Sequence, residues 1–166
     1  ITLGYLENMD ADYIQKRLST FDGVKRRYTV QEVGNNVYVD DYAHHPTAIK
    51  YVIEATRSRY PGKEIVAIFQ PDRFSRGLRF AKEFAESMNL ADYPFLVHFP
   101  ENAKKEAGID IDIHEIGQYL PRAIVIHEDE DAVKLLAEHD DVVFLFMSSK
   151  DIYKFEDMLI DYKSTH

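Results

Sequence analysis

Glu64-Ile65-Val66-Ala67-Ile68-Phe69-Gln70 is a short, nearly continuous apolar run within a chain of 166 residues. A strand that is covered on both faces reads as an unbroken apolar run, whereas a half-exposed strand alternates apolar and polar residues. The turn-forming residues Tyr60-Pro61-Gly62 stand just before it. The run therefore predicts a buried strand inside a parallel sheet.

Segments with the periodicity of helices alternate with further apolar runs around this strand. Pro46 is suited to the first position of a helix, and Ile49, Val52, Ile53 and Thr56 then form one helical stripe. Further helices are expected over residues 75–88, 112–120, 129–138 and 151–162, and further strands over residues 93–99, 123–127 and 141–147. This alternation predicts an α/β fold class, namely a Rossmann-like, doubly wound, mostly parallel sheet.

The N-terminal part departs from this order. Residues 28–33 and 36–39 read as strands on either side of Gly34-Asn35, and Gly and Asn tolerate the positive φ of a tight turn. We expect this β-hairpin to add the antiparallel pair of the sheet.

A domain boundary is predicted near Gly23. A short helix is expected over residues 10–21, before the α/β unit begins. Residues 1–22 would then be the end of a preceding domain and residues 23–166 the α/β domain. The chain begins at Ile1 rather than at Met, which indicates an excised fragment.

Composition limits the partners of the chain. The formal net charge of −9 argues against nucleic acid and anionic membranes, since both attract basic surfaces. Cysteine is absent, which excludes disulfides and thiolate metal sites and fits a cytoplasmic protein. No apolar run approaches the roughly 20 residues that span a membrane. We therefore expect small-molecule partners.

The most unusual polar stretch is Asp40-Asp41-Tyr42-Ala43-His44-His45-Pro46. It follows a strand, and ligands of open parallel sheets bind beyond the carboxyl ends of the strands. Two acids, a phenol and two imidazoles in one connection favour a functional site over a polar turn. The adjacent side chains of His44 and His45 diverge, unlike the i, i+4 pair of a zinc helix, so we predict no metal site.

A second polar connection, Gln70-Pro71-Asp72-Arg73-Phe74-Ser75-Arg76, follows the strand expected over residues 64–70. Arg73 and Arg76 share one face if a helix begins near Arg73. Guanidinium groups suit a carboxylate or a phosphate, because each can form two parallel hydrogen bonds to it. The alternative is a solvated helix start in which Asp72 pairs with one of the arginines.

Two further stretches each allow a functional and a structural interpretation. Gly23-Val24-Lys25-Arg26-Arg27-Tyr28 is a basic cluster that would either meet phosphates or serve as a linker. Ser148-Ser149-Lys150-Asp151 follows the last strand, and we expect its serines to cap the last helix. Neither a G-x-x-x-x-G-K-[ST] loop nor a G-x-G-x-x-G fingerprint occurs in the sequence.

Residues 23–28, 39–46 and 69–76 together resemble, in order and spacing, the C-terminal domain of the Mur ligases. Residues 1–22 look like the last helix of the preceding, ATP-binding domain of that family. The resemblance is nearest to the members that add L-alanine to UDP-N-acetylmuramate in peptidoglycan precursor synthesis. It implies a ligase that uses ATP to activate a carboxylate as an acyl phosphate, which the amino acid then attacks. ATP and Mg²⁺ would be bound mainly by the central domain, so this chain should be inactive alone.

The resemblance also implies roles at matching positions. Arg27 and Asp41 would contact the nucleotide. The acceptor amino acid would lie among five side chains, with the two arginines holding its carboxylate and one imidazole in support: Tyr42, His44, His45, Arg73 and Arg76. No catalytic group and no metal ligand is expected in this chain.

Two positions depart from the family pattern. Asp72 stands where the family usually has His, and Ser148-Ser149-Lys150 replaces a glycine-rich turn, which bears on the choice of acceptor. One alternative is the recycling ligase that adds a whole tripeptide to the same sugar nucleotide. Another is a non-catalytic binding domain, either of Mur ligase ancestry or like a signalling receiver domain. Asp40 and Asp41 resemble the acidic pair of a receiver only loosely, because the phosphoacceptor expected after the middle strand is missing.

Overall fold

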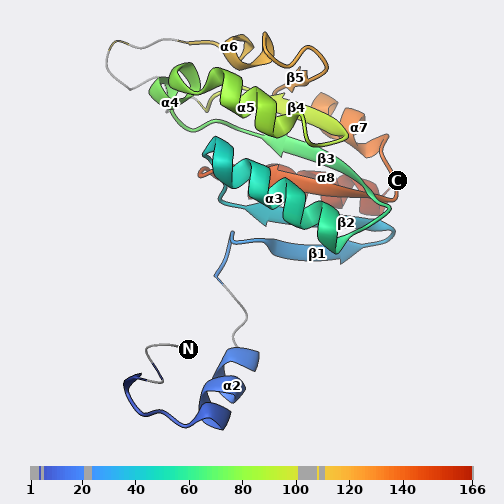
Figure 1. Ribbon diagram of the computed structural model, residues 1–166. Coiled ribbons are helices and arrows are strands. Elements are labelled where there is room, and N and C mark those ends of the chain that lie inside the picture. The colour runs from blue at the N-terminus through green and yellow to red at the C-terminus, as the bar shows by residue number, and fades with distance from the viewer. Residues whose placement is uncertain (1–3, 5, 21–23, 101–107, 109–110, 166) are drawn as a thin grey trace.

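The computed structural model describes residues 4, 6–20, 24–100, 108 and 111–165. Within them lies a six-stranded sheet with the strand order β1-β2-β6-β3-β4-β5 (Figure 1). The strands are β1 (Thr29–Val33), β2 (Asn36–Asp41), β3 (Glu64–Phe69), β4 (Tyr93–Val97), β5 (Ile124–Ile126) and β6 (Val142–Met147). The hairpin β1-β2 is antiparallel and every other pair is parallel, which confirms the predicted fold class and its hairpin.

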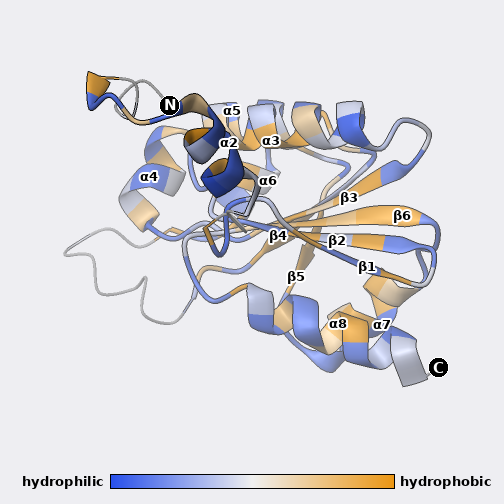
Figure 2. Cartoon of the chain, turned by 90° about the horizontal axis from the view of Figure 1, so that it is seen from below, coloured by the Kyte–Doolittle hydropathy of each residue, from blue (hydrophilic) through white to orange (hydrophobic). Residues whose placement is uncertain are grey.

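Helices cover both faces of the sheet. The helices α3 (Pro46–Arg59) and α5 (Ala81–Met88) lie on one face, and α7 (Glu130–Ala137) and α8 (Tyr153–Thr165) lie on the other (Figure 2). The central strand serves both layers, because Ile65, Ala67 and Phe69 pack toward α3 and α5 while Val66 and Ile68 pack toward α7 and α8. Burial of alternate residues on opposite faces explains why β3 is apolar throughout.

The return of the chain to β6 places a topological switch point between β3 and β6. From β2 to β5 the strands add in one direction, and β6 then inserts between β2 and β3. The connection after β3 leads to the helices of one face and the connection after β6 leads to α8 on the other (Figure 2). Connections that diverge in this way leave the space in which doubly wound folds bind ligands.

Some helices are shorter than predicted. The segment expected as one helix over residues 75–88 forms two, α4 (Phe74–Arg79) and α5, separated at Phe80 with φ −120° and ψ 24°. The helix expected over residues 112–120 is reduced to α6 (His114–Gly117). In both segments the helical spacing of apolar residues continues through a bend. Packing against the sheet, rather than helical hydrogen bonding, determines this spacing, so the pattern alone does not reveal the bend.

The helix α2 (Ala11–Ser19) begins at its N-cap Asp10, whose carboxylate accepts a hydrogen bond from the Tyr13 amide at 3.0 Å. None of its residues is buried, and Figure 1 shows it apart from the sheet. An amphipathic helix without a packed face needs a further surface to be stable. The assignment of residues 1–22 to a preceding domain is consistent with this exposure and stays a prediction. No helix in the described part of the chain has the length and apolar character required to cross a bilayer.

Gly77→Ala in α4 is expected to destabilise the fold by about 1–3 kcal/mol, the usual cost of overpacking a buried site. A Cβ atom there would lie 2.8 Å from Cζ of Phe99 and 2.8 Å from Cδ1 of Ile111. Urea unfolding measures the loss. Gly117→Ala is the matched control, because the added Cβ would meet its nearest neighbour, Leu96, at 3.9 Å. Equal stability of the two variants would contradict the prediction.

Candidate functional site at the carboxyl edge of the sheet

The first component of the site is Asp41, the last residue of β2. Its side chain is buried, and its two oxygens accept hydrogen bonds of 2.8 Å from the backbone amides of Tyr28 and Ala43. The Tyr42 amide also donates to the Arg26 carbonyl at 2.9 Å. The Asp41 carboxylate therefore holds residues 24–28, here called the basic turn, against the end of β2. This geometry does not test its predicted contact with a nucleotide.

Arg26 is a residue whose importance the sequence analysis missed. Its guanidinium donates to the carbonyls of Ser148, at 2.8 Å, and Lys150, and its Nε lies 3.4 Å from Asp40. It thus joins the basic turn to the connection after β6, across a separation of more than 120 residues. The sequence contains only a run of three basic residues, and nothing in it distinguishes the inward-facing Arg26 from the exposed Arg27.

Tyr42 contacts both the exposed side chain of Arg27 and the imidazole of His44. The guanidinium carbon of Arg27 lies 4.9 Å from the centre of the Tyr42 ring, within the range of a cation–π interaction. The rings of Tyr42 and His44 meet edge to face at 5.0 Å. His44 Nδ1 lies 2.8 Å from the Tyr42 carbonyl, which only accepts, so Nδ1 is the protonated nitrogen. A neutral His44 then presents Nε2 as a hydrogen-bond acceptor.

His45 has a structural contact instead. It is the N-cap of α3, and its Nδ1 accepts a hydrogen bond from the Thr47 amide at 3.4 Å. Its ring packs against Phe80 with the centroids 5.2 Å apart. Since adjacent side chains of an extended segment point to opposite sides, His45 lies against α4 and α5 while His44 lies over the edge of the sheet.

The two predicted arginines differ in their surroundings. Arg76 donates to Asp72 at 2.8 Å and to the His44 carbonyl at 3.4 Å, and its side chain is 24% exposed. The Arg73 side chain is 61% exposed, and its Nε lies 4.0 Å from the Asp72 carboxylate. The structure therefore shows the pairing with Asp72 that the sequence analysis kept as an alternative. Arg76 is held in place, whereas Arg73 extends further into solvent.

The connection after β6 completes this arrangement. Ser149 Oγ donates to the second oxygen of the buried Asp72 at 2.8 Å, so Asp72 joins the connections after β3 and β6. The prediction that these serines cap the last helix is wrong, since α8 begins only at Tyr153. Ser148 Oγ instead accepts a hydrogen bond from the Lys150 amide at 3.0 Å and closes a local turn.

The site as a whole combines cations with a fixed imidazole. Arg73, Arg76, Tyr42 and His44 come from the connections after two strands, β2 and β3, that are separated in the sheet only by β6. Among the described residues, no group of three or more His, Asp or Glu side chains is placed to hold a metal ion. The geometry suits an organic anion, for which the arginines supply charge and directed hydrogen bonds.

Comparison with known proteins finds ligases of the same fold. A UDP-N-acetylmuramate-alanine ligase from Thermotoga maritima has 24% identity and a TM-score of 0.79, over 100% of this chain and 36% of its own. A murein peptide ligase from Psychrobacter arcticus 273-4 has 23% identity and a TM-score of 0.69, over 91% of this chain and 32% of its own. A MurF ligase from Thermotoga maritima, solved in complex with ADP, has 22% identity and a TM-score of 0.71, over 99% of this chain and 36% of its own. These likenesses show a shared fold.

The chain spans about a third of the length of these three ligases. The family model described as "Mur ligase, glutamate ligase domain" matches residues 25–149, which is most of the α/β domain. The matched segment holds all seven residues that the resemblance implied for substrate and nucleotide binding. The chain therefore belongs to the Mur ligase family, of which it carries the glutamate ligase domain.

Proposed function

We propose that this chain is the C-terminal domain of an ATP-dependent ligase that adds L-alanine to UDP-N-acetylmuramate in cytoplasmic peptidoglycan precursor synthesis. ATP would supply the phosphoryl group that activates the muramate carboxylate, and a central domain outside this chain would hold ATP and Mg²⁺. Residues 1–22 would be the end of that central domain. The present domain would contribute the acceptor site, so it should be inactive alone.

The observation that carries the proposal is the convergence of Arg73, Arg76, Tyr42 and His44 at one edge of the sheet. An amino acid presents a carboxylate and an amine, and this edge presents guanidinium donors beside an imidazole acceptor. Holding the amine near an activated carbonyl lowers the barrier by orientation, by up to roughly 7–11 kcal/mol in ideal cases. Closure against a central domain would also exclude water, which would otherwise hydrolyse an acyl phosphate.

The geometry allows different roles for the two arginines. Arg73 would bind the acceptor carboxylate directly, because its side chain is the more exposed. Arg76, which is held by Asp72 and by the His44 carbonyl, would add charge and position the connection that carries His44. His45 would support this arrangement by capping α3.

The nucleotide would approach from the basic turn. Arg27 and Tyr42 form a cation–π pair at 4.9 Å, and an exposed guanidinium over an aromatic ring fits both a phosphate and a base. Asp41 would act on the nucleotide through this turn, since its carboxylate holds the Tyr28 amide. The ADP complex of the similar MurF ligase supports a nucleotide site in this family.

The tripeptide-adding recycling ligase is the second candidate. The similar structures include a murein peptide ligase, at 23% identity, beside the alanine ligase at 24%. Asp72 also neutralises part of the charge that a free amino-acid carboxylate would meet. This second observation favours an acceptor, such as the tripeptide, for which contacts other than those of the carboxylate contribute more to binding.

Phosphate release from ATP by the full-length protein tests the proposal. The assay contains UDP-N-acetylmuramate and, in turn, L-alanine, glycine, L-serine or the tripeptide. Turnover that depends on L-alanine is the expected result. Turnover with the tripeptide alone would reassign the protein to the recycling ligases, and no turnover with any acceptor would indicate a domain kept for binding.

A further inference from the structure

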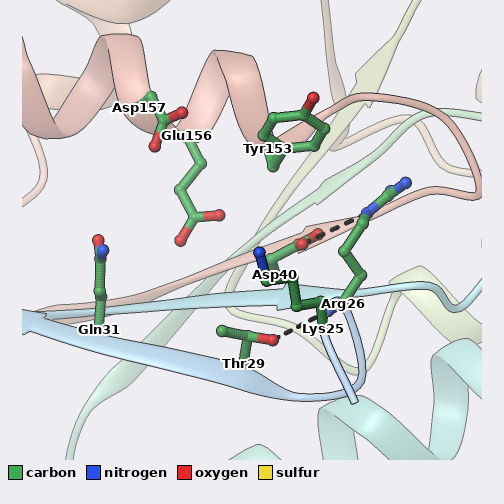
Figure 3. Close-up of a pocket in the computed structure, with 8 residues that line it drawn as sticks. All are labelled: Lys25, Arg26, Thr29, Gln31, Asp40, Tyr153, Glu156 and Asp157. Atoms are coloured by element: carbon green, nitrogen blue, oxygen red, sulfur yellow. Dashed lines mark hydrogen bonds and ion pairs between the residues drawn. The ribbon is translucent and has the colours of Figure 1, made fainter.

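A second pocket lies on the α8 face of the sheet, away from α3 and α5. It occupies about 580 Å³ between the N-terminal half of α8 and the β1-β2 hairpin (Figure 3). The lining residues come from the basic turn, both hairpin strands and the helix: Lys25, Arg26, Thr29, Gln31, Asp40, Tyr153, Glu156 and Asp157. None of the proposed acceptor-binding residues lines it, although it shares Arg26 with the turn from which the nucleotide would approach.

Two nearly buried carboxyl groups face this pocket without sufficient hydrogen-bond donors. Asp40 is 6% exposed, and its Oδ1 is buried with no hydrogen-bond partner among the described residues. Glu156 is 7% exposed, and within the described part of the chain its carboxyl group forms no hydrogen bond. Figure 3 shows the Glu156 side chain extending from α8 toward the strand that carries Asp40. Buried polar groups are nearly always satisfied, so the unpartnered oxygen of Asp40 indicates a missing donor.

The cations nearby do not supply that donor. Arg26 Nε forms an ion pair at 3.4 Å with the other oxygen of Asp40 and is itself buried without a hydrogen bond among the described residues, while its terminal nitrogen is already bonded to the carbonyls after β6. Lys25 is exposed at the rim. Burial, together with the charges of Asp40 and Asp157, raises the pKa of Glu156 to about 8, so an ionised Glu156 lacks compensation.

The chemistry of the lining selects the kind of ligand. The described residues include no set of three acidic or imidazole side chains placed to coordinate a metal ion, which argues against a divalent cation. A primary ammonium instead offers three N–H donors, and Gln31 and Thr29 add polar groups on the hairpin side. Asp157 lies one residue beyond Glu156 and is exposed, so a second positive group would meet it at the rim.

We propose that this pocket binds a small alkyl diamine, with one ammonium between Asp40 and Glu156 and the other at Asp157. The bound ammonium takes the place of the proton on Glu156 and supplies the donor that Asp40 Oδ1 lacks. Tyr153 closes the pocket toward the carboxyl edge, where its ring already lies 5.6 Å from the Arg26 guanidinium carbon.

Titration of the 166-residue chain with putrescine, followed by ¹H–¹⁵N NMR, tests this site. The Gln31 side-chain amide and the amides around Glu156 are expected to shift. The affinity should rise about tenfold from pH 7 to pH 9, because a cation competes with the proton of a group that titrates near pH 8. Tetramethylammonium, which has no N–H donor, should leave these signals in place.

Glu156→Gln is the test variant and Asp161→Asn the control. The test variant should lose putrescine binding and its pH dependence. The control removes the same charge from the same helix, but Asp161 lies at another surface pocket, so its binding should stay within twofold of the parent. No shift with putrescine at pH 9, an equal shift with tetramethylammonium, or unchanged binding by Glu156→Gln would each overturn the proposal.

The midpoint of thermal unfolding provides a readout that does not depend on an NMR shift. A carboxyl group whose folded pKa is raised from 4.5 to about 8 stabilises the fold at low pH, and this contribution is lost as pH rises through 8. The midpoint should therefore fall between pH 5 and pH 9 in the parent by more than in Glu156→Gln. Putrescine at pH 9 should restore it in the parent and leave it unchanged in the variant, whereas equal responses in both chains would contradict the site.

Discussion

Arg73→Ala in the full-length ligase is expected to raise the KM for the acceptor amino acid by about 10- to 100-fold, with a smaller change in kcat. Hydrogen bonds to charged groups contribute about 1.5–3 kcal/mol, which corresponds to this range. The Arg73 side chain is 61% exposed and only 4.0 Å from Asp72, so its removal takes charge from the acceptor site with little effect on packing. Steady-state kinetics with varied L-alanine measures the change.

Two further arginine variants make the result specific. Arg79→Ala is the control, because Arg79 is the last residue of α4, the short helix whose N-cap is Arg73, and its guanidinium carbon lies 5.2 Å from the centre of the Phe80 ring. Its KM should stay near that of the parent. Arg76→Ala should lower both stability and kcat/KM, since it leaves the buried Asp72 carboxylate without its closest cation. An unchanged KM in Arg73→Ala would remove this residue from the acceptor site.

Asp41→Ala is expected to destabilise the domain by about 2–6 kcal/mol, because one buried and one partly buried backbone amide would each lose an acceptor at a cost of roughly 1–3 kcal/mol. The amides belong to Tyr28 and Ala43, on either side of the junction between the basic turn and β2. Urea unfolding of the 166-residue chain measures the loss. This is the largest effect that we expect on stability from a single polar residue.

Two further variants test whether the loss of stability comes from the hydrogen bonds of Asp41 or only from the removal of a negative charge. Asp41→Asn keeps one carbonyl oxygen and should recover part of the lost stability. Asp151→Ala removes an exposed carboxylate that pairs with Lys154 at 3.2 Å, so its effect should stay within about 0.5 kcal/mol. If Asp41→Ala unfolded at the same urea concentration as Asp151→Ala, Asp41 would not be the anchor of the basic turn.

The basic turn links stability to the proposed function. Arg26 and Tyr28 both adopt positive φ values, 59° and 54°, which non-glycine residues seldom do. Asp41 and the carbonyls after β6 hold this conformation through hydrogen bonds to both residues. A change that loosens the turn would therefore move Arg27 away from Tyr42 and affect nucleotide binding as well as folding.

Local patterns in the sequence determined the elements and their order. The unbroken apolar run of β3 required cover on both faces, and Gly34, with φ 61°, occupies the turn of the predicted hairpin. The same patterns placed the polar stretches after β2 and β3 at the carboxyl edge of the sheet. Periodicity and turn chemistry are properties of neighbouring residues, so they can be read without the fold.

The tertiary structure alone decided which of these residues act together. The insertion of β6 between β2 and β3 brings Ser149 to Asp72 and the carbonyls of residues 148 and 150 to Arg26. These partners are 77 to 124 residues apart, and no local pattern encodes such pairs. The roles of Arg26, Asp72 and the Asp40–Glu156 pocket therefore follow from strand order. Strand order sets which polar side chains are buried together in a low-dielectric environment, where they must form hydrogen bonds or ion pairs with one another.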